Sequence, residues 1–159
     1  MKKIIFVCTG NICRSPTAEG VMARLIKQHQ LEHLFELDSA GIMGHHQGEA
    51  PDHRTQRFAQ KRGYDLSGLR ARKLLPQDYR EFDYLLAMDE GHLEFMLENC
   101  PPELKAKKHI SLFLDFSLRW RGQAVPDPYY QGAEAFELVL DQVEEACTHL
   151  LEHMKQELK

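Results

Sequence analysis

The sequence predicts an α/β domain that is built around a parallel sheet. Short apolar runs, several of them rich in β-branched residues, alternate along the chain with longer amphipathic segments. The first run, Ile4 to Val7, is apolar at every position, which is typical of a parallel strand covered on both faces. We find no repeat, linker or low-complexity tract, so the 159 residues are expected to form one domain, 1–159.

Four strands and four helices are predicted in alternating order. The strands are residues 4–7, 35–40, 84–88 and 109–113. The first helix is expected to open with Ser15 as N-cap and Pro16 at a first helical position. Its apolar face carries Val21, Met22, Leu25 and Ile26. The second helix covers residues 54–61 and stops at Gly63, which suits the left-handed backbone after a helix end.

The last two helices follow the third and fourth strands. One bears Leu93, Met96 and Leu97, and Pro101 and Pro102 break it. The other runs from about Ala133 with an apolar stripe of Phe136, Leu140, Val143, Cys147, Leu150 and Met154. Residues 41–52 and 120–131 are predicted to be loops. Ligands of such folds bind outside the carboxyl ends of the strands, which is where Cys8 falls.

Composition excludes several classes of function. A net charge of −4 leaves no basic surplus to meet a nucleic acid. The apolar stretch after Lys2 and Lys3 is too short for a signal peptide, and no run approaches a membrane span, so we expect a cytoplasmic protein without a membrane partner. Four cysteines in a chain of this length are expected to be reduced thiols.

The segment from Cys8 to Ser15 has the composition of an anion site between a strand and a helix. A thiol and a guanidinium, Cys8 and Arg14, flank a loop of backbone amides at Thr9, Gly10, Asn11, Ile12 and Cys13. Gly10 and Asn11 tolerate the left-handed backbone that a tight anion nest requires. The positive end of the following helix points at the same place. A phosphate-sized dianion would fit here.

The same electrostatics favour chemistry at sulfur. A helix N-terminus and a neighbouring cation favour the thiolate, which is the nucleophilic form of Cys8. Arg14 can hold two phosphoryl oxygens in a fork through the transition state. Ser15 could donate a hydrogen bond to the sulfur and ease its departure when water cleaves a phosphocysteine.

A leaving alkoxide or phenoxide needs a proton donor from another loop. Asp127 is the best candidate because Pro126 and Pro128 stiffen the segment on both sides of it. Without the loop at Cys8, the same tripeptide would be interpreted as a surface turn. Tyr129 and Tyr130 are core aromatics in one interpretation and, beside an acid, the walls of a slot for a planar ring in the other.

Four segments together resemble the low-molecular-weight protein tyrosine phosphatases over nearly the whole chain. They are Val7 to Pro16, Asp38 to Gly41, Met88 to Glu90, and Asp127 to Tyr130. The resemblance implies a three-layer, doubly wound, flavodoxin-like fold with a four-stranded parallel sheet, and hydrolysis of phosphotyrosine or small aryl phosphates without metal or cofactor.

By the same resemblance, Cys8 is the nucleophile, Arg14 the phosphate clamp, Asp127 the general acid and then the base, and Ser15 the aid to dephosphorylation. Asn11 and Ser39 would hold the loop in shape, and Cys13 would form a reversible disulfide with the nucleophile. The implied partners are phosphotyrosine proteins, among them a tyrosine kinase as in bacterial relatives. The protein is expected to be a monomer or a weak dimer.

Two positions depart from many relatives. Leu69 replaces a histidine that supports the phosphate loop, so we expect a modest loss of rate or a different loop support. His45 stands where relatives often place an aromatic residue beside the substrate ring, which predicts pH-sensitive recognition.

Four alternatives stay open from sequence. A zinc site at Cys8 and Cys13 lacks a second ligand pair at suitable spacing. Arginine phosphatases of this fold typically have Thr at the position of Ile12 and lack the paired tyrosines. Arsenate reductases need two further cysteines close together, whereas Cys100 and Cys147 are far apart. A phosphopeptide-binding module would need Arg14 but neither the thiol nor Asp127.

Overall fold

A computed structural model describes residues 1–158, and its centre is a four-stranded parallel sheet. The strands are β1 (Lys2–Cys8), β2 (Phe35–Gly41), β3 (Tyr84–Ala87) and β4 (His109–Leu112), in the order β2-β1-β3-β4. The predicted strands are therefore confirmed, although β3 and β4 each end one residue early. The chain passes from β1 to β2 on one side and then returns to β3 on the other, so the carboxyl end of β1 lies at the switch point where flavodoxin-like folds bind ligands.

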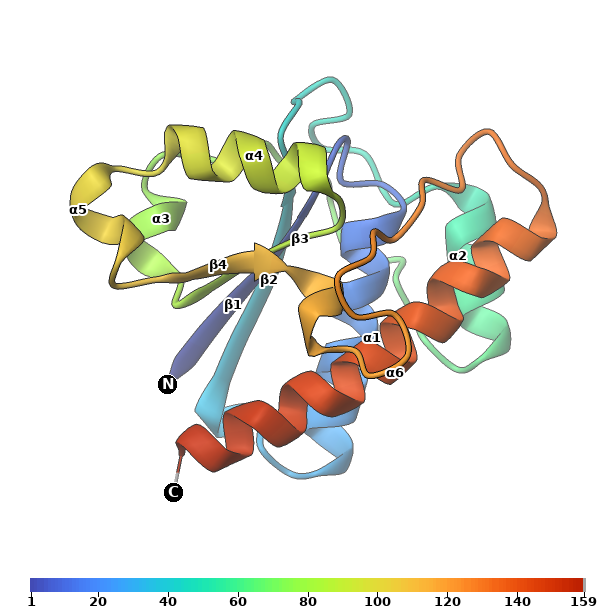
Figure 1. The fold of residues 1–159 in the computed structure, drawn as a ribbon. Helices are drawn as coiled ribbons and strands as arrows, with labels where there is room; N and C mark the ends of the chain where they lie inside the picture. Colours follow the sequence, from blue (N-terminus) through green and yellow to red (C-terminus); the bar gives the residue numbers. More distant parts are fainter. Residues whose placement is uncertain (159) are drawn as a thin grey trace.

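Helices cover both faces of the sheet, which gives the predicted three layers (Figure 1). On one face lie α1 (Arg14–Gln28) and α6 (Ala133–Glu157), with α2 (His53–Lys61) beside them. On the other face lie α3 (Asp78–Glu81), α4 (Glu90–Asn99) and α5 (Pro102–Lys105). The four-residue helices α3 and α5 were not predicted, because so short a segment has no helical periodicity to detect.

Strand β1 supplies side chains to both cores. Ile4, Phe6 and Cys8 pack toward α1 and α6, whereas Ile5 and Val7 pack toward α4 and α5. All five are at most 2% exposed. This alternation confirms that the continuous apolar run is a strand buried on both faces, and it fixes Cys8 on the α1 side of the sheet.

Two further short 3₁₀ helices, η1 (Glu32–Leu34) and η2 (Phe113–Phe116), complete the described elements. The whole predicted stripe of α6 is buried, from Phe136 to Met154. In α4, by contrast, Met96 is buried, Leu93 is half-buried and Leu97 is 39% exposed, so this helix presents a narrower apolar face than the sequence suggests.

Candidate active site

The loop from Cys8 to Ser15 turns directly from β1 into α1. Asn11 has the left-handed φ of 60° that the residue pattern predicts. The carbonyls of Cys8 and Thr9 accept hydrogen bonds from the backbone of Ile42 and Met43, which ties the loop to the end of β2. Gly41 permits this approach, since a Cβ there would lie 2.5 Å from the Thr9 oxygen.

The predicted N-cap is wrong, because α1 begins at Arg14 and Ser15 lies inside its first turn. The Ser15 hydroxyl is fully buried and faces the loop interior. Its Oγ lies 2.9 Å from Cys8 Sγ and accepts a hydrogen bond of 2.7 Å from the Asn11 amide. Both contacts of the Ser15 hydroxyl are therefore with the loop.

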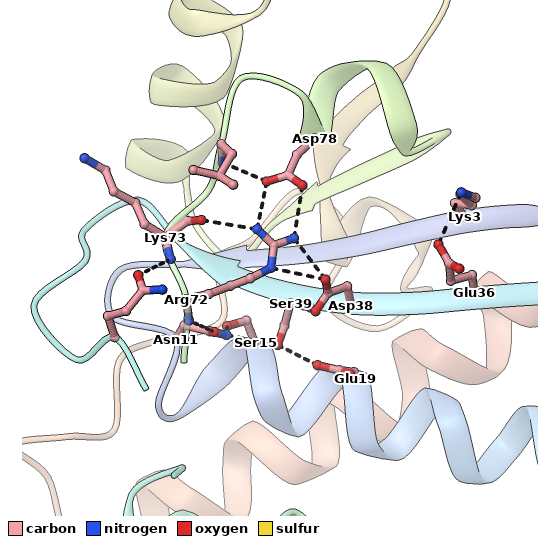
Figure 2. Close-up of polar contacts among 12 residues, drawn as sticks. Lys3, Asn11, Ser15, Glu19, Glu36, Asp38, Ser39, Arg72, Lys73 and Asp78 are labelled. Atoms are coloured by element: carbon pink, nitrogen blue, oxygen red, sulfur yellow. Dashed lines mark hydrogen bonds and ion pairs between the residues drawn. The ribbon is translucent and has the colours of Figure 1, made fainter. Parts of the chain in front are cut away.

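Asn11 holds the loop together from beneath (Figure 2). Its second amide hydrogen is donated to Ser39 Oγ at 2.9 Å, and its carbonyl accepts from the backbone N–H of Arg72 at 3.0 Å. Ser39 Oγ in turn donates a hydrogen bond of 2.7 Å to Glu19 Oε1. The structure therefore brings Asn11 and Ser39 together as predicted, and Asn11 is only 2% exposed.

Two residues that sequence reasoning did not assign complete this support. Burial raises the pKa of the Glu19 carboxyl above its usual range, which the hydrogen bond from Ser39 partly offsets. The Arg72 side chain bridges Asp38 and Asp78 (Figure 2), so the segment that reaches Asn11 is itself clamped. Leu69, where we expected weaker support, is half-buried against the core, and the polar network under the loop is closed without it.

Arg14 is 4% exposed, and its guanidinium is held on three sides. Nη1 donates to Asp89 Oδ2 and to the Val125 carbonyl, both at 3.0 Å. Nη2 donates to Thr9 Oγ1 at 3.3 Å and lies 3.7 Å from Asp127 Oδ2. A buried cation in a strand-to-helix turn is thus fixed in orientation beside the sulfur loop and beside the candidate acid.

Asp89 and His92 were missed as site residues, although Asp89 falls in a segment that the sequence singled out. Asp89 follows β3 at the same sheet edge as Cys8, and this position alone signals proximity. It caps α4 in a reciprocal pair with His92, whose Nε2 lies 2.8 Å from Thr9 Oγ1. Burial, together with the nearby Arg14, lowers the pKa of His92 to about 4 against the pull of Asp89.

Asp127 reaches the site on a segment that is anchored at both ends. The backbone N–H of Val125 donates to the Met88 carbonyl at 2.8 Å, and the N–H of Tyr129 donates to Asp127 Oδ1 at 3.1 Å. Arg54, a further unpredicted residue, donates to the Tyr129 carbonyl at 2.7 Å and lies 5.3 Å from the centre of its ring. The Asp127 side chain remains 48% exposed and open to a ligand.

These groups converge on one cleft of about 320 Å³. Its lining is Cys8, Thr9, Gly10, Ile12, Cys13, Arg14, His45, His46, Asp127, Tyr129 and Tyr130. Every predicted catalytic or substrate-binding residue lines it except Asn11 and Ser15, which lie behind the loop. His46 was not predicted: its ring lies 4.1 Å from that of His45 and pairs with Glu49.

The remaining candidates are a redox cysteine and a metal site. Cys13 lines the cleft, and burial raises the pKa of its thiol to about 12. All four cysteines are free thiols. Between residues 1 and 158 no group of three or more metal-ligating side chains is assembled, so the zinc interpretation lacks ligands. No helix in that range is long and apolar enough to cross a membrane.

Comparison with known proteins identifies this architecture. The family model described as low molecular weight phosphotyrosine protein phosphatase matches residues 3–159. The chain belongs to this family. It is 42% identical to a candidate low molecular weight protein-tyrosine-phosphatase of Synechocystis sp., over 98% of both chains.

Solved structures of the same fold agree. A protein tyrosine phosphatase from Entamoeba histolytica superposes with a TM-score of 0.93 at 36% identity, over 100% of both chains. A Drosophila arginine phosphatase superposes with a TM-score of 0.86 at 32% identity, over 98% of both chains. The fold and the family are therefore shown, and phosphatases named for two different phosphorylated side chains share this fold.

Proposed function

We propose that this protein hydrolyses phosphotyrosine in proteins, and small aryl phosphates, through a phosphocysteine intermediate on Cys8. The observation that carries the proposal is the convergence of Cys8, Arg14 and Asp127 on a single cleft, with Ser15 against the sulfur. A nucleophile, a phosphate clamp and a proton donor are what covalent phosphoryl transfer from an aryl ester requires.

In the first step the Cys8 thiolate attacks phosphorus while the bond from phosphorus to the phenolic oxygen breaks. Backbone amides of the loop and Arg14 stabilise the charge on the equatorial oxygens. Asp127 donates its proton to the leaving phenolate, so that tyrosine departs neutral. Its position 3.7 Å from Arg14 supports this role, because it places the carboxyl beside the bound phosphoryl group.

In the second step water attacks phosphorus and the sulfur leaves. Asp127, now ionised, accepts a proton from the water. Ser15 supports departure of the thiolate: its Oγ accepts from Asn11, which leaves its own hydrogen free for Cys8 Sγ. The products are inorganic phosphate and the free enzyme.

Phosphotyrosine is favoured over phosphoarginine by the walls of the cleft. Ile12 lines the cleft where arginine phosphatases typically have Thr, and Tyr129 and Tyr130 face the same space. The two tyrosine rings lie 4.8 Å apart, with Tyr129 held by Arg54. The two rings pack edge to face and form one aromatic wall, and a planar ring against this wall gains contacts that a flexible guanidinium stem would not match.

The test is phosphate release from a phosphotyrosine peptide, with reductant and without added metal, by the wild type and by Cys8→Ser. Turnover by the wild type alone supports the proposal. A phosphoarginine peptide assayed in parallel decides the side chain, and faster turnover of it would overturn the phosphotyrosine assignment. If Cys8→Ser retains activity, the proposed nucleophile is wrong.

A further inference from the structure

A closed ring of contacts joins the Arg14 guanidinium to Asp89, His92 and Thr9. Arg14 Nη1 donates to Asp89 Oδ2 at 3.0 Å, and Asp89 is joined to His92 in the cap of α4. His92 Nε2 lies 2.8 Å from Thr9 Oγ1, and Thr9 returns to Arg14, accepting from Nη2 at 3.3 Å. Each terminal nitrogen of the guanidinium is therefore bound to a residue that His92 touches.

The cap of α4 decides which ring nitrogen of His92 carries the hydrogen. In the reciprocal cap, Asp89 Oδ1 accepts from the His92 backbone N–H at 3.0 Å, and His92 Nδ1 accepts from the Asp89 backbone N–H at 3.3 Å. Glu or Gln usually fills this position. Nδ1 also lies 3.2 Å from Asp89 Oδ1, which could accept a hydrogen from it. We assign the hydrogen of the neutral ring to Nε2, because the backbone N–H of Asp89 donates to Nδ1, and Nε2 then donates to Thr9.

Burial, aided by Arg14 and opposed by Asp89 and Asp127, keeps His92 in this neutral form. It is 2% exposed, and the charged groups around it are Arg14, Asp89 and Asp127. Burial and Arg14 lower the pKa of the imidazole to about 4. At neutral pH the ring is thus a donor with a constant direction, as a positioning contact needs.

Thr9 receives two hydrogen bonds, from His92 and from Arg14, and both acceptor sites of its hydroxyl are then occupied. Its own hydrogen remains to be donated, and Thr9 lines the cleft. The hydroxyl therefore accepts a hydrogen bond from Arg14 and keeps one hydrogen that it can donate to a ligand in the cleft.

We propose that His92 is a positioning residue that acts through Thr9 and Asp89 to hold Arg14 in the orientation that binds the phosphoryl group, and that the Thr9 hydroxyl adds a hydrogen-bond donor to this site. The inference rests on the proposed function, since it assigns the phosphate clamp of the same cleft. It concerns the side chains of Thr9, which was expected to contribute only its backbone amide, and of His92, for which no role was predicted.

The test measures the inhibition constant of inorganic phosphate against p-nitrophenyl phosphate, together with kcat and KM. Thr9→Val removes the hydroxyl at nearly constant shape, and His92→Leu removes both ring contacts. Each is expected to raise the phosphate inhibition constant by about tenfold. Thr9→Ser and His92→Gln keep the donors and acceptors and are expected to restore most of the affinity.

The combined variant Thr9→Val/His92→Leu is expected to weaken phosphate binding by less than the product of the two single effects, because both variants remove the contact between His92 and Thr9. Additive losses would overturn the proposal, as would an unchanged inhibition constant in Thr9→Val. A purely structural His92 would lower the melting temperature of His92→Leu and leave phosphate binding intact, which also contradicts it. Should His92→Leu not fold, Thr9→Val alone decides.

Failure of this inference is separable from failure of the proposed function. If the wild type turns over aryl phosphates but the variants match it, only the role of His92 falls. If the wild type has no phosphatase activity, the proposed function falls. Phosphate affinity of the wild type and Thr9→Val, measured by calorimetry, then still tests the positioning of Arg14.

Discussion

The Oγ of Ser15 lies 2.9 Å from the Sγ of Cys8, and Asn11 donates to the same oxygen at 2.7 Å. When Cys8 is a thiolate, its sulfur has no hydrogen to give, so the hydrogen between the two atoms comes from the serine. A hydrogen bond of this kind stabilises a thiolate and makes sulfur a better leaving group.

Ser15→Ala is therefore expected to slow the second chemical step more than the first. We expect kcat to fall by about tenfold, with the phosphocysteine accumulating. Rapid mixing with p-nitrophenyl phosphate should show a burst of nitrophenol that the wild type lacks. Ser111→Ala is the matched control, since that hydroxyl bonds a neighbouring carbonyl on β4 and lies outside the cleft. Loss of activity without a burst would contradict this role of Ser15.

Asp127→Asn tests the proton donor through the leaving group. An amide cannot protonate a phenolate, so turnover of phenyl phosphate should fall by about 100-fold or more. Nitrophenolate is a far better leaving group and should lose less. Equal losses on both substrates would show that Asp127 acts through Arg14, 3.7 Å away, rather than on the leaving group. Asp115→Asn, in η2, is the control.

His45→Trp tests the rim of the cleft. An indole beside the substrate ring should strengthen binding of phosphotyrosine peptides, lowering KM by a fewfold, because it adds aromatic contact area. Hydrolysis of p-nitrophenyl phosphate should change little. The His45 ring lies 4.1 Å from that of His46, so the indole could displace His46. His46→Ala is therefore the control that measures the effect of losing the His46 ring alone. Equal changes in the kinetics of both substrates would show that His45 does not take part in recognition of the peptide.

Local residue chemistry explains why so much of the fold and cleft could be predicted. The run from Ile4 to Val7 has one structural solution, and the left-handed Asn11 and the anion loop follow from residue types next to one another. Residues that long-range packing brings to the site were harder to predict from the sequence. Asp89 and His92 lie together at the start of α4, and Arg54 lies in α2. Only the strand order and the path of the 125–130 segment place these residues beside Cys8.

Ser15 shows the opposite limit, that of local rules. A serine before a proline is a common helix start. The sequence predicted the contact between Ser15 and the sulfur, but not that this contact and the Asn11 amide would take the place of the capping role. The departure at Leu69 is similar. Its sequence position implied weaker loop support, but the backbone N–H of Arg72 serves Asn11 from the same segment. Leu69→His tests whether the leucine lowers the rate of turnover. If a histidine there adds support to the loop, kcat should rise modestly.

Arg72→Met is expected to be strongly destabilising. The guanidinium compensates Asp78, whose side chain is 4% exposed, and also binds Asp38 (Figure 2). Removing it leaves a buried carboxylate without its cation, which should lower the free energy of unfolding by about 3 kcal/mol in urea titrations. Arg80→Met breaks an ion pair with Glu103 in which both side chains are 59% exposed, and should cost less than about 1 kcal/mol. Similar losses of stability in the two variants would show that the buried ion pair of Arg72 contributes no more than an exposed one.

The neutral state of His92 makes stability fall as the solution becomes acidic. Burial lowers its pKa to about 4, from the ordinary histidine value of 6.5 that an unfolded chain would show. Between about pH 6.5 and about pH 4 the unfolded state therefore binds more protons than the folded state, and the free energy of unfolding decreases as pH falls through this window. Relative to His92→Gln, the wild type should lose about 2 kcal/mol more stability between about pH 7 and about pH 5.

Urea titrations of the two proteins at these two pH values measure the difference. Glu19, whose pKa is raised by burial, acts in the opposite direction, but it is present in both proteins and cancels. The lowered pKa of Asp89 acts mainly below this window, since its carboxyl is ionised in both states at about pH 5. If the two proteins lose stability in parallel, the pKa of His92 is the same in the folded and unfolded states, and burial does not keep the ring neutral.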